Sequence, residues 1–243
     1  MLKIKVLIAK LLVNNFNGRI ISILFSNKIP FYNIKIDISN PIIKRRIAAA
    51  LFFKTYESSE IRYIKKHINN YKGIIIELGS SIGVVSSIVA KDNPKAIVYT
   101  FEADERFIPI VKNNYLINDI NNANSFQGII GEEGYEFSVG EDNTMGKILK
   151  SNNSNQTLTN LSSIVEKNNI GDFALISDIE GAEYFILNEN KNVFNNCTLI
   201  IMEMHDIEIE DKVIKVEDLV NRVLELGFTI VERYGSNIVA KKM

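Results

Sequence analysis

The stretch that decides the fold is residues 73–90, which read GIIIELGSSIGVVSSIVA. Its first four residues are small or β-branched and apolar, which is typical of a strand buried on both faces of a parallel sheet. The segment Gly79–Gly83 then predicts a tight turn, and the apolar run from Val84 predicts a helix packed on the sheet. Glu77 is a charge at the end of a buried strand, where open α/β sheets bind ligands.

An acidic residue also follows the next predicted strand. Residues 97–101 are strand-like and lead directly to Glu102, which lies 23 positions after Gly79. This offset is close to the roughly 20 residues at which an acidic side chain in such folds meets the two hydroxyls of a ribose. Nicotinamide nucleotides and S-adenosylmethionine both carry this diol, so the two strands predict a nucleoside cofactor without identifying it.

Four ordered segments resemble the FkbM-type family of S-adenosylmethionine-dependent methyltransferases. They are ELGSSIG (77–83), TFEAD (100–104), SDIEGAEYFIL (177–187) and IIMEMH (200–205). The most specific part is Glu180–Glu183, whereas Ser177 departs from the pattern because the family usually has lysine there. The resemblance covers about residues 56–240. It implies an α/β fold with a Rossmann-like, doubly wound, mostly parallel seven-stranded sheet of the class I methyltransferase type.

The end of the chain favours the same class. Residues 216–226 predict an amphipathic helix that Gly227 ends, and residues 228–232 and 238–240 predict an antiparallel hairpin. The resemblance implies such an ending for methyltransferases, which distinguishes them from dehydrogenases with a similar sheet. The hairpin therefore favours S-adenosylmethionine over a nicotinamide cofactor.

The resemblance also implies which residues bind the cofactor. They lie before the first strand, in its turn, and after the second and third strands: Glu57, Glu77, Leu78, Gly79, Ser80, Ser81, Gly83, Val84, Glu102, Ala103, Gly128 and Ile129. Tyr56 and Glu57 are expected at the amino group of the cofactor, and a solvated Glu57 is an equal alternative. Gly128 and Ile129 are expected at the edge of the adenine.

Three acidic residues follow the predicted fourth strand, residues 173–176. Asp178, Glu180 and Glu183 lie within six positions, so their charges would repel unless a cation, a substrate hydroxyl or protons intervene. Glu183 falls in the first turn of a helix, where a negative charge is favourable, and this predicts a structural cap. Asp178 is expected near the position where the methyl group faces an acceptor.

The predicted fifth strand, residues 198–204, leads to Glu203 and His205. These two side chains are expected on one face and could converge with Asp178. Transfer of a methyl group to a hydroxyl oxygen benefits from a positioned base or a metal ion. His205 is the predicted base because imidazole is neutral near physiological pH, with Asp178, Glu203 and Glu180 completing the catalytic set. The alternatives are a divalent ion held by Asp178, Glu203 and His205, and a histidine that only bonds to a carboxylate.

Composition is consistent with one globular α/β domain, and the resemblance implies its bounds, residues 56–243, after an N-terminal extension, residues 1–55. A chain of 243 residues with 46% hydrophobic and 23% charged residues can bury one sizeable core. The net charge of −1 indicates no bulk attraction to nucleic acid. The single cysteine, Cys197, excludes an internal disulfide and favours a reducing compartment, the cytoplasm.

The N-terminal extension mixes apolar and basic residues. No uninterrupted apolar run approaches the roughly 18 residues that a spanning helix needs, and no secretory signal pattern is recognisable. The favoured prediction is an apolar face packed on the domain or in a homodimer. The alternative is a basic amphipathic helix in residues 1–28 that touches a membrane surface or a partner chain. Residues 33–40 alternate as a short half-buried strand, and residues 42–69 predict two helices.

For the middle of the chain, the resemblance implies a loop on the substrate side. Residues 124–130 read as the third strand, and residues 135–139 as a strand paired beside it. Residues 141–155 are polar and rich in Asn and Ser, which is typical of a mobile lid or of disorder. Residues 157–169 predict a helix before the fourth strand.

Three functions are consistent with these patterns. The leading one is methyl transfer from S-adenosylmethionine to a hydroxyl of a sugar, a glycan precursor or a small metabolite, as the resemblance implies. The second is an NAD-dependent oxidoreductase, disfavoured by the hairpin and by Glu180–Glu183. The third is a binding protein that keeps the fold without its chemistry, which Ser177 motivates.

Overall fold

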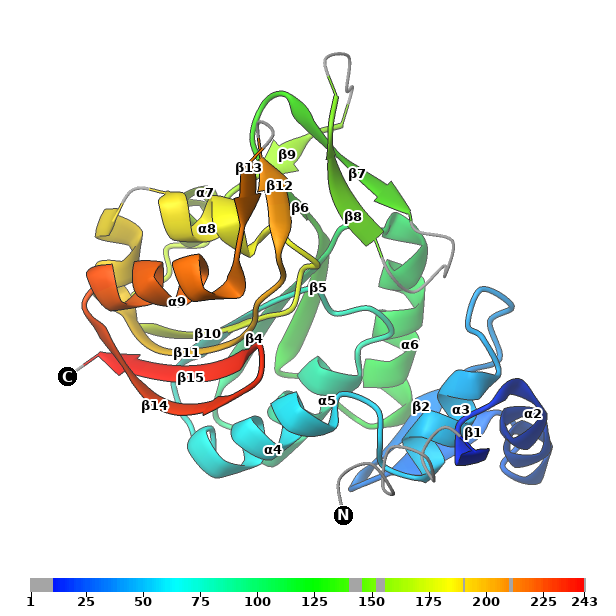
Figure 1. Cartoon of the computed structure of the whole chain (residues 1–243). Coiled ribbons are helices and arrows are strands. Elements are labelled where there is room, and N and C mark those ends of the chain that lie inside the picture. The colour runs from blue at the N-terminus through cyan, green and yellow to red at the C-terminus, as the bar shows by residue number, and fades with distance from the viewer. Residues whose placement is uncertain (1–10, 140–145, 152–155, 190, 210–211, 243) are drawn as a thin grey trace.

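A seven-stranded mixed sheet forms the centre of the molecule (Figure 1). The computed structural model describes residues 11–139, 146–151, 156–189, 191–209 and 212–242. The strand order is β14-β15-β11-β10-β3-β4-β5. The strands are β3 (Ile74–Leu78), β4 (Ile97–Glu102), β5 (Ala123–Gln127), β10 (Phe173–Ser177), β11 (Cys197–Glu203), β14 (Phe228–Tyr234) and β15 (Asn237–Lys242).

The direction of these strands confirms the predicted fold class. The five strands from β11 to β5 are parallel to their neighbours, whereas β15 runs antiparallel to both β11 and β14. In the parallel register, Leu78 of β3 lies opposite Ser177 of β10 and Phe101 of β4. The turns that follow these three strands therefore meet at one edge of the sheet, as the Rossmann-like prediction requires.

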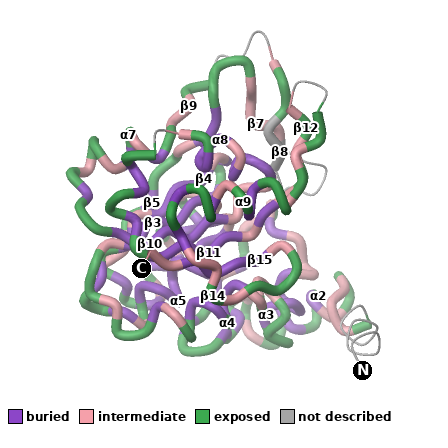
Figure 2. The backbone as a smooth tube through the Cα atoms, turned by 60° about the vertical axis from the view of Figure 1, so that its left-hand side comes forward, coloured by how far each residue is buried: buried purple, intermediate pink, exposed green. Residues whose placement is uncertain are grey.

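Helices cover both faces of the sheet, and Figure 2 shows the strands as the most buried part of the chain. One face carries α4 (Ser58–His67), α5 (Val84–Asp92) and α6 (Ile108–Ile117). The other face carries α7 (Leu161–Lys167), α8 (Glu183–Asn188) and α9 (Val216–Glu225). Two short 3-10 helices, η1 (Glu105–Phe107) and η2 (Lys191–Asn196), complete these layers. Among the described helices, none is long and apolar enough to cross a bilayer.

The described part of the N-terminal extension packs beside α5 and α6 (Figure 1). It contains α2 (Asn15–Leu24), β1 (Lys28–Phe31), β2 (Ile34–Asp37) and α3 (Arg46–Phe52). The strand predicted in residues 33–40 is confirmed as β2, and its antiparallel partner β1 was not predicted. Two asparagines accept hydrogen bonds from the β2 backbone, each at 2.8 Å: Asn114 of α6 from Asp37 N–H, and Asn118, the C-cap of α6, from Lys35 N–H. Residues 1–10 of the predicted amphipathic segment lie outside the described residues.

Three predictions about the middle of the chain are wrong in detail. Residues 135–139 form β7 (Tyr135–Val139), which pairs with β8 (Gly146–Lys150) and not with the third strand. The predicted polar loop thus contains a strand, and residues 140–145 and 152–155 of that region lie outside the described residues. The third strand ends at Gln127, and Gly128, where a Cβ would lie 3.0 Å from the Phe101 ring, separates it from β6 (Ile129–Ile130).

The helix predicted over residues 157–169 is shorter than expected. Asn160 caps α7 by accepting a hydrogen bond from Ser163 N–H, so the helix begins at Leu161. The preceding residues form β9 (Leu158–Thr159), which pairs with β6 in parallel. One more short hairpin, β12 (Ile207–Ile209) with β13 (Lys212–Ile214), follows the fifth strand of the parallel sheet.

Candidate active site

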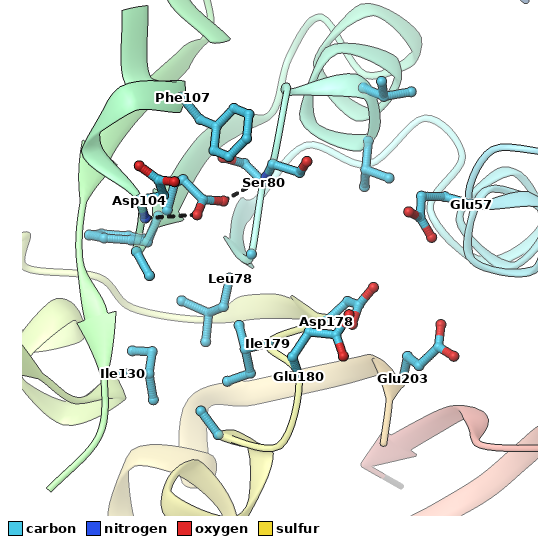
Figure 3. Close-up of a pocket in the computed structure, with 18 of the residues that line it drawn as sticks. Glu57, Leu78, Ser80, Asp104, Phe107, Ile130, Asp178, Ile179, Glu180 and Glu203 are labelled. Carbon is cyan, nitrogen blue, oxygen red and sulfur yellow. Dashed lines mark hydrogen bonds between the residues drawn. The ribbon is translucent and has the colours of Figure 1, made fainter. Parts of the chain in front are cut away.

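A cavity of about 520 Å³ opens where the turns after β3, β4, β10 and β11 meet (Figure 3). This volume lies within the roughly 300–1,000 Å³ typical of small-molecule sites. Fourteen of the predicted site residues line it: Glu57, Leu78, Gly79, Ser80, Ser81, Val84, Glu102, Ala103, Gly128, Ile129, Asp178, Glu180, Glu203 and His205. The structure thus brings together groups that lie up to 148 positions apart in the sequence.

Two predicted cofactor residues, Glu77 and Gly83, do not line the cavity. Glu77 is almost completely buried beneath the turn, where it accepts a hydrogen bond from the Thr100 hydroxyl, and burial raises its pKa to about 7. Gly83 has a φ of +77° at the start of α5, and a Cβ there would lie 2.9 Å from Val111 of α6. Both residues therefore shape the turn from behind and do not face the ligand.

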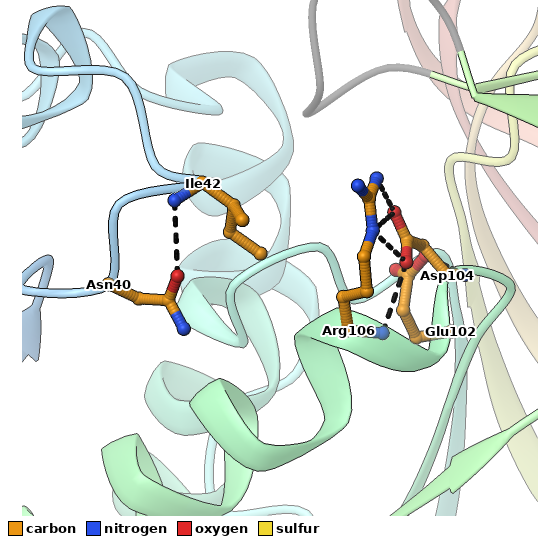
Figure 4. A network of polar contacts seen from close by, with 5 residues as sticks. All are labelled: Asn40, Ile42, Glu102, Asp104 and Arg106. Atoms are coloured by element: carbon orange, nitrogen blue, oxygen red, sulfur yellow. Dashed lines mark hydrogen bonds and ion pairs between the residues drawn. The ribbon is translucent and has the colours of Figure 1, made fainter.

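Glu102 is held rigidly at one end of the cavity. One of its carboxylate oxygens accepts a hydrogen bond from Ser81 N–H at 2.6 Å, and the other accepts one from Asp104 N–H at 2.9 Å. Burial nevertheless raises the pKa of Glu102 to about 7. Figure 4 shows that Arg106 pairs with Asp104, with Nε 2.8 Å from Oδ1, so this cation serves Asp104 and not Glu102. Each Glu102 oxygen keeps a lone pair that could accept a hydrogen bond from a ribose hydroxyl.

The turn after β3 lets neighbouring groups approach its backbone closely. Gly79 has a φ of +87°, and a Cβ on it would lie 1.8 Å from the carbonyl oxygen of Asp178. The hydroxyl of Ser80 is buried in the cavity wall without a hydrogen-bond partner among the described residues. A buried hydroxyl of this kind is stabilised when a ligand supplies the missing bond. The turn and Glu102 together fit the polar ribose and methionine groups of S-adenosylmethionine.

The opposite end of the cavity is strongly acidic. Figure 3 shows Glu57, Asp178 and Glu203 directing their carboxylates into the same space, and one oxygen of each lies within 4.8 Å of the others. Burial first, and Glu203 next, raise the pKa of Glu57 to about 7. Burial and Glu57 raise the pKa of Asp178 well above its ordinary value. Asp178 Oδ1 has no hydrogen-bond partner among the described residues. This end is therefore suited to a cation or to a group that donates hydrogen bonds.

Sequence reasoning missed one member of this acidic end, Glu60. It lines the cavity with only 7% of its surface exposed, and within the described part of the chain it has no hydrogen bond or ion pair. Burial and the neighbouring Glu57 raise its pKa well above the ordinary value. The sequence position of Glu60 could have indicated this, because it lies three residues after Glu57 and next to the buried Ile61, on the inward face of α4.

His205 is held between carboxylates. Its Nδ1 lies 3.4 Å from Glu183 Oε1, and its Nε2 lies 3.6 Å from Glu180 Oε2 and 3.9 Å from Asp178 Oδ1. Burial acts to lower the pKa of His205, but the hydrogen bond to Glu183 and the surrounding negative charges outweigh it and raise the pKa to about 9. This raised pKa favours the protonated ring at physiological pH and so runs against the expectation that the imidazole is neutral there.

Glu183 has a role other than the predicted cap. Its carboxylate accepts hydrogen bonds from Ile179 N–H and Gly181 N–H, each at 2.9 Å, and is fully buried at the start of α8. These bonds anchor the turn after β10, which the sequence did not predict, and α8 has no side-chain cap hydrogen bond at its start. The same carboxylate also faces His205 Nδ1, so it can fix the orientation of the ring.

The metal site predicted from Asp178, Glu203 and His205 is not formed as a single group of three among the described residues. Asp178 lies within ligand spacing of Glu183 and His205 in one group, and of Glu57 and Glu203 in another. Glu183 is already engaged by two backbone N–H groups. The carboxylate group is therefore the better of the two for a hard divalent cation, which prefers oxygen donors.

Comparison with known proteins identifies the family. The sequence profile of the methyltransferase FkbM domain matches residues 77–230, well over half of the chain. No curated protein sequence matches it. The solved structures to which the chain is similar include a methyltransferase from Pyrococcus furiosus (13% identity, TM-score 0.47), covering 93% of this chain and 94% of that one. Another is a SAM-dependent methyltransferase from Aquifex aeolicus (10% identity, TM-score 0.42), covering 76% and 89%.

A third similar structure is the magnesium protoporphyrin IX methyltransferase of Synechocystis PCC 6803 with bound SAH (11% identity, TM-score 0.45), covering 78% of this chain and 82% of that one. The profile match falls on the strands and turns that surround the cavity, from Glu77 at the end of β3 to Ile230 in β14. The chain therefore belongs to the FkbM methyltransferase domain family, and its cofactor is S-adenosylmethionine.

Proposed function

We propose that this protein transfers a methyl group from S-adenosylmethionine to a hydroxyl oxygen of a sugar, a glycan precursor or a small metabolite. The observation that carries the proposal is the position of His205. Its Nδ1 faces the anchored Glu183, and its Nε2 faces the acidic end of the same cavity that contains Glu102. A hydroxyl is a weak nucleophile, so a base at this position accelerates transfer to oxygen.

In this proposal one end of the cavity binds the cofactor and the other end binds the acceptor. Glu102 accepts hydrogen bonds from the ribose hydroxyls, and Gly79, Ser80 and Ser81 lie along the methionine part. Gly128 and Ile129 lie at the adenine, and Glu57 pairs with the amino group. When bound, the cofactor supplies an electrophilic methyl carbon on a positively charged sulfur. The acceptor hydroxyl then occupies the acidic end, near Asp178 and His205.

His205 takes the proton of the acceptor. A hydrogen bond from Nδ1–H to Glu183 places the lone pair of the neutral ring on Nε2, which faces the cavity. As the acceptor oxygen forms its bond to the methyl carbon and the bond from that carbon to sulfur breaks, leaving S-adenosylhomocysteine, Nε2 receives the hydroxyl proton. Asp178 and Glu180, both within 4 Å of Nε2, stabilise the imidazolium that results. A third group that orients the base, as Glu183 orients His205 here, is a recurring feature of enzymes that activate a nucleophile.

Activity on a panel of acceptors tests the proposal. Purified protein is incubated with S-adenosylmethionine that carries a labelled methyl group and with hydroxylated sugars, glycans and metabolites from the producing cell. We expect label in an ether linkage of at least one acceptor, located by mass spectrometry. Label on nitrogen or carbon would overturn the assignment to oxygen.

Calorimetry with S-adenosylhomocysteine and with NAD separates the remaining alternatives. Binding of the first and not of the second is expected, in agreement with the family. A protein that binds S-adenosylhomocysteine tightly yet methylates no acceptor in the panel would be a binding protein without chemistry, the alternative that Ser177 motivates.

A further inference from the structure

The charge of the chain is divided unequally between its two parts. Residues 1–55 contain ten lysines and arginines and one acidic residue, Asp37, which gives a formal charge of +9. The remaining 188 residues contain 18 basic and 28 acidic residues, a formal charge of −10. The overall value of −1 conceals this separation. An asymmetry of this size points to a partner of negative charge at the N-terminal extension.

Helix α2 is apolar on two faces, of which only one is covered. Gly18, Ile21 and Ser22 are buried, and a Cβ on Gly18 would lie 1.8 Å from the carbonyl oxygen of Arg45, so this face packs tightly on the segment leading into α3. The outer face leaves Phe16 74% exposed and Ile23 71% exposed. Large apolar side chains that none of the described residues covers mark a surface where another molecule can bind.

The exposed apolar surface extends beyond α2. We call it the extension patch, and its members are Leu11, Phe16, Ile20, Ile23, Leu24, Phe52 and Phe53. The rings of Phe25 and Phe52 lie 5.4 Å apart, which joins the end of α2 to the end of α3. Arg19 is exposed on the same helix, and α2 has no acidic residue in its first turn. The covered side of α2 packs on α3 and β1 of the extension itself. An apolar face packed on the domain or in a homodimer stays a prediction.

We propose that the extension patch binds the surface of an anionic lipid bilayer. Exposed apolar side chains on a short helix within a strongly basic segment are features that place a helix in the interface of a membrane. A symmetric dimer through the same surface would bring two strongly positive extensions together, which Coulomb repulsion opposes. Nucleic acid would satisfy the basic residues but would leave Phe16 and Ile23 in water.

The extension also reaches the cavity. Arg46 and Ile47 of α3 line it, and α3 is the helix against which α2 packs. A protein bound through the extension patch would hold its cavity close to the bilayer. The lipid surface would then be the place where the enzyme meets an acceptor, although binding itself requires no catalytic activity and can be tested without it.

Co-sedimentation of the full-length protein with lipid vesicles tests the proposal. Vesicles of phosphatidylcholine alone are compared with vesicles that also contain phosphatidylserine. Each basic residue near an anionic surface strengthens binding about fivefold, so we expect at least about tenfold stronger binding to the anionic vesicles. Raising the salt from about 0.1 M to about 1 M should release most of the protein, because the Debye length shortens from about 10 Å to about 3 Å.

Matched variants show whether the patch itself is responsible. Phe16→Ser combined with Ile23→Ser should reduce binding about tenfold or more, whereas Leu224→Ser, a 47% exposed leucine on α9, should leave it unchanged. Arg19→Glu should weaken binding to anionic vesicles, and Lys212→Glu should not. Equal sedimentation of the patch variant and the Leu224 variant would overturn the proposal. So would a stable dimer in light scattering that Phe16→Ser dissociates, or retention on nucleic acid with no binding to vesicles.

Discussion

His205 controls the proposed reaction through its protonation state. Its pKa is raised to about 9, so only about one ring in a hundred is neutral at pH 7. If the neutral ring is the base, we expect kcat/KM, which reports the pKa of the unliganded enzyme, to rise about tenfold per pH unit and to level off above about pH 9. The measurement is a pH–rate profile with labelled cofactor. His205→Gln should lose both the rise and most of the activity.

Glu183→Gln provides the control for that profile. Removing the charge that faces Nδ1 should lower the pKa of His205 towards its ordinary value and move the rise in rate to lower pH.

The raised pKa of His205 also affects the stability of the folded protein. The interaction stabilises the protein fully below the unfolded pKa of about 6.5, and this contribution is lost as the pH rises through about 9. A wild-type rate that is flat between about pH 6 and pH 10 would contradict the role of His205 as the base.

Glu102 should contribute strongly to cofactor affinity. Its carboxylate can bind both ribose hydroxyls while it holds Ser81 N–H and Asp104 N–H. Glu102→Gln keeps the shape but removes the charge and one acceptor oxygen. Hydrogen bonds to charged groups contribute about 1.5–3 kcal/mol each, so we expect the Kd for S-adenosylhomocysteine to rise about 10–100-fold by calorimetry. Glu133→Gln, an exposed glutamate that does not line the cavity, should leave the Kd unchanged. An unchanged Kd in a folded Glu102→Gln protein would exclude the ribose assignment.

Glu102 lines the cavity, and its role at the ribose stays a prediction, but the sequence could not show that Glu60, and not Glu77, faces the cavity. Both are buried, yet Glu77 lies behind the turn and Glu60 faces the cavity. Which face of a strand or helix meets a ligand depends on the packing of distant elements, and spacing along the chain does not contain that information. The charge of His205 was unpredictable for the same reason, because Glu183 lies 22 positions away in the sequence and 3.4 Å away in space.

The turn between β3 and α5 is the element on which cofactor binding depends. Gly79 and Gly227 share a φ of +87°, but only Gly79 has a neighbour that a Cβ would meet, the carbonyl oxygen of Asp178 at 1.8 Å. Alanine at either position is strained by about 1–2 kcal/mol. We expect Gly79→Ala to lower the free energy of unfolding by clearly more than Gly227→Ala in urea titrations, and to abolish binding of S-adenosylhomocysteine. Equal losses of stability would show that the contact with β10 is unimportant.

Elements with strong local patterns were predictable, and those that depend on distant pairing were not. The apolar run of β3, the strand ending at Glu102 and the C-terminal hairpin each show their pattern within a few residues. In contrast, β7 pairs with β8, a strand that starts at Gly146 in a polar segment and has no sequence signal of its own. Strand partners are chosen by the complete fold, so local pattern could identify β7 but not its neighbour.

At the scale of the whole molecule, the N-terminal extension and the sheet share one core. Ile29, Phe31 and Ile36 of the extension are fully buried in the same apolar cluster as Ile88 of α5 and Val239 of β15. The sequence indicated an extension because the family resemblance begins near residue 56, which is a boundary of homology. A boundary of homology need not be a boundary of folding, since folding units are defined by shared burial.

This shared core predicts that the extension unfolds together with the sheet. Ile36→Ala removes buried methyl groups from a side chain that has no exposed surface, so it should lower the free energy of unfolding by about 2–5 kcal/mol. We expect one transition, in which peptides from β2 and from β15 lose hydrogen-exchange protection together as urea increases. Phe53→Ala, at an exposed position of the same extension, should cost little. If the β2 peptide instead exchanges early while β15 stays protected, residues 1–55 are a separate folding unit, because only a core that is not shared allows one part to melt without the other.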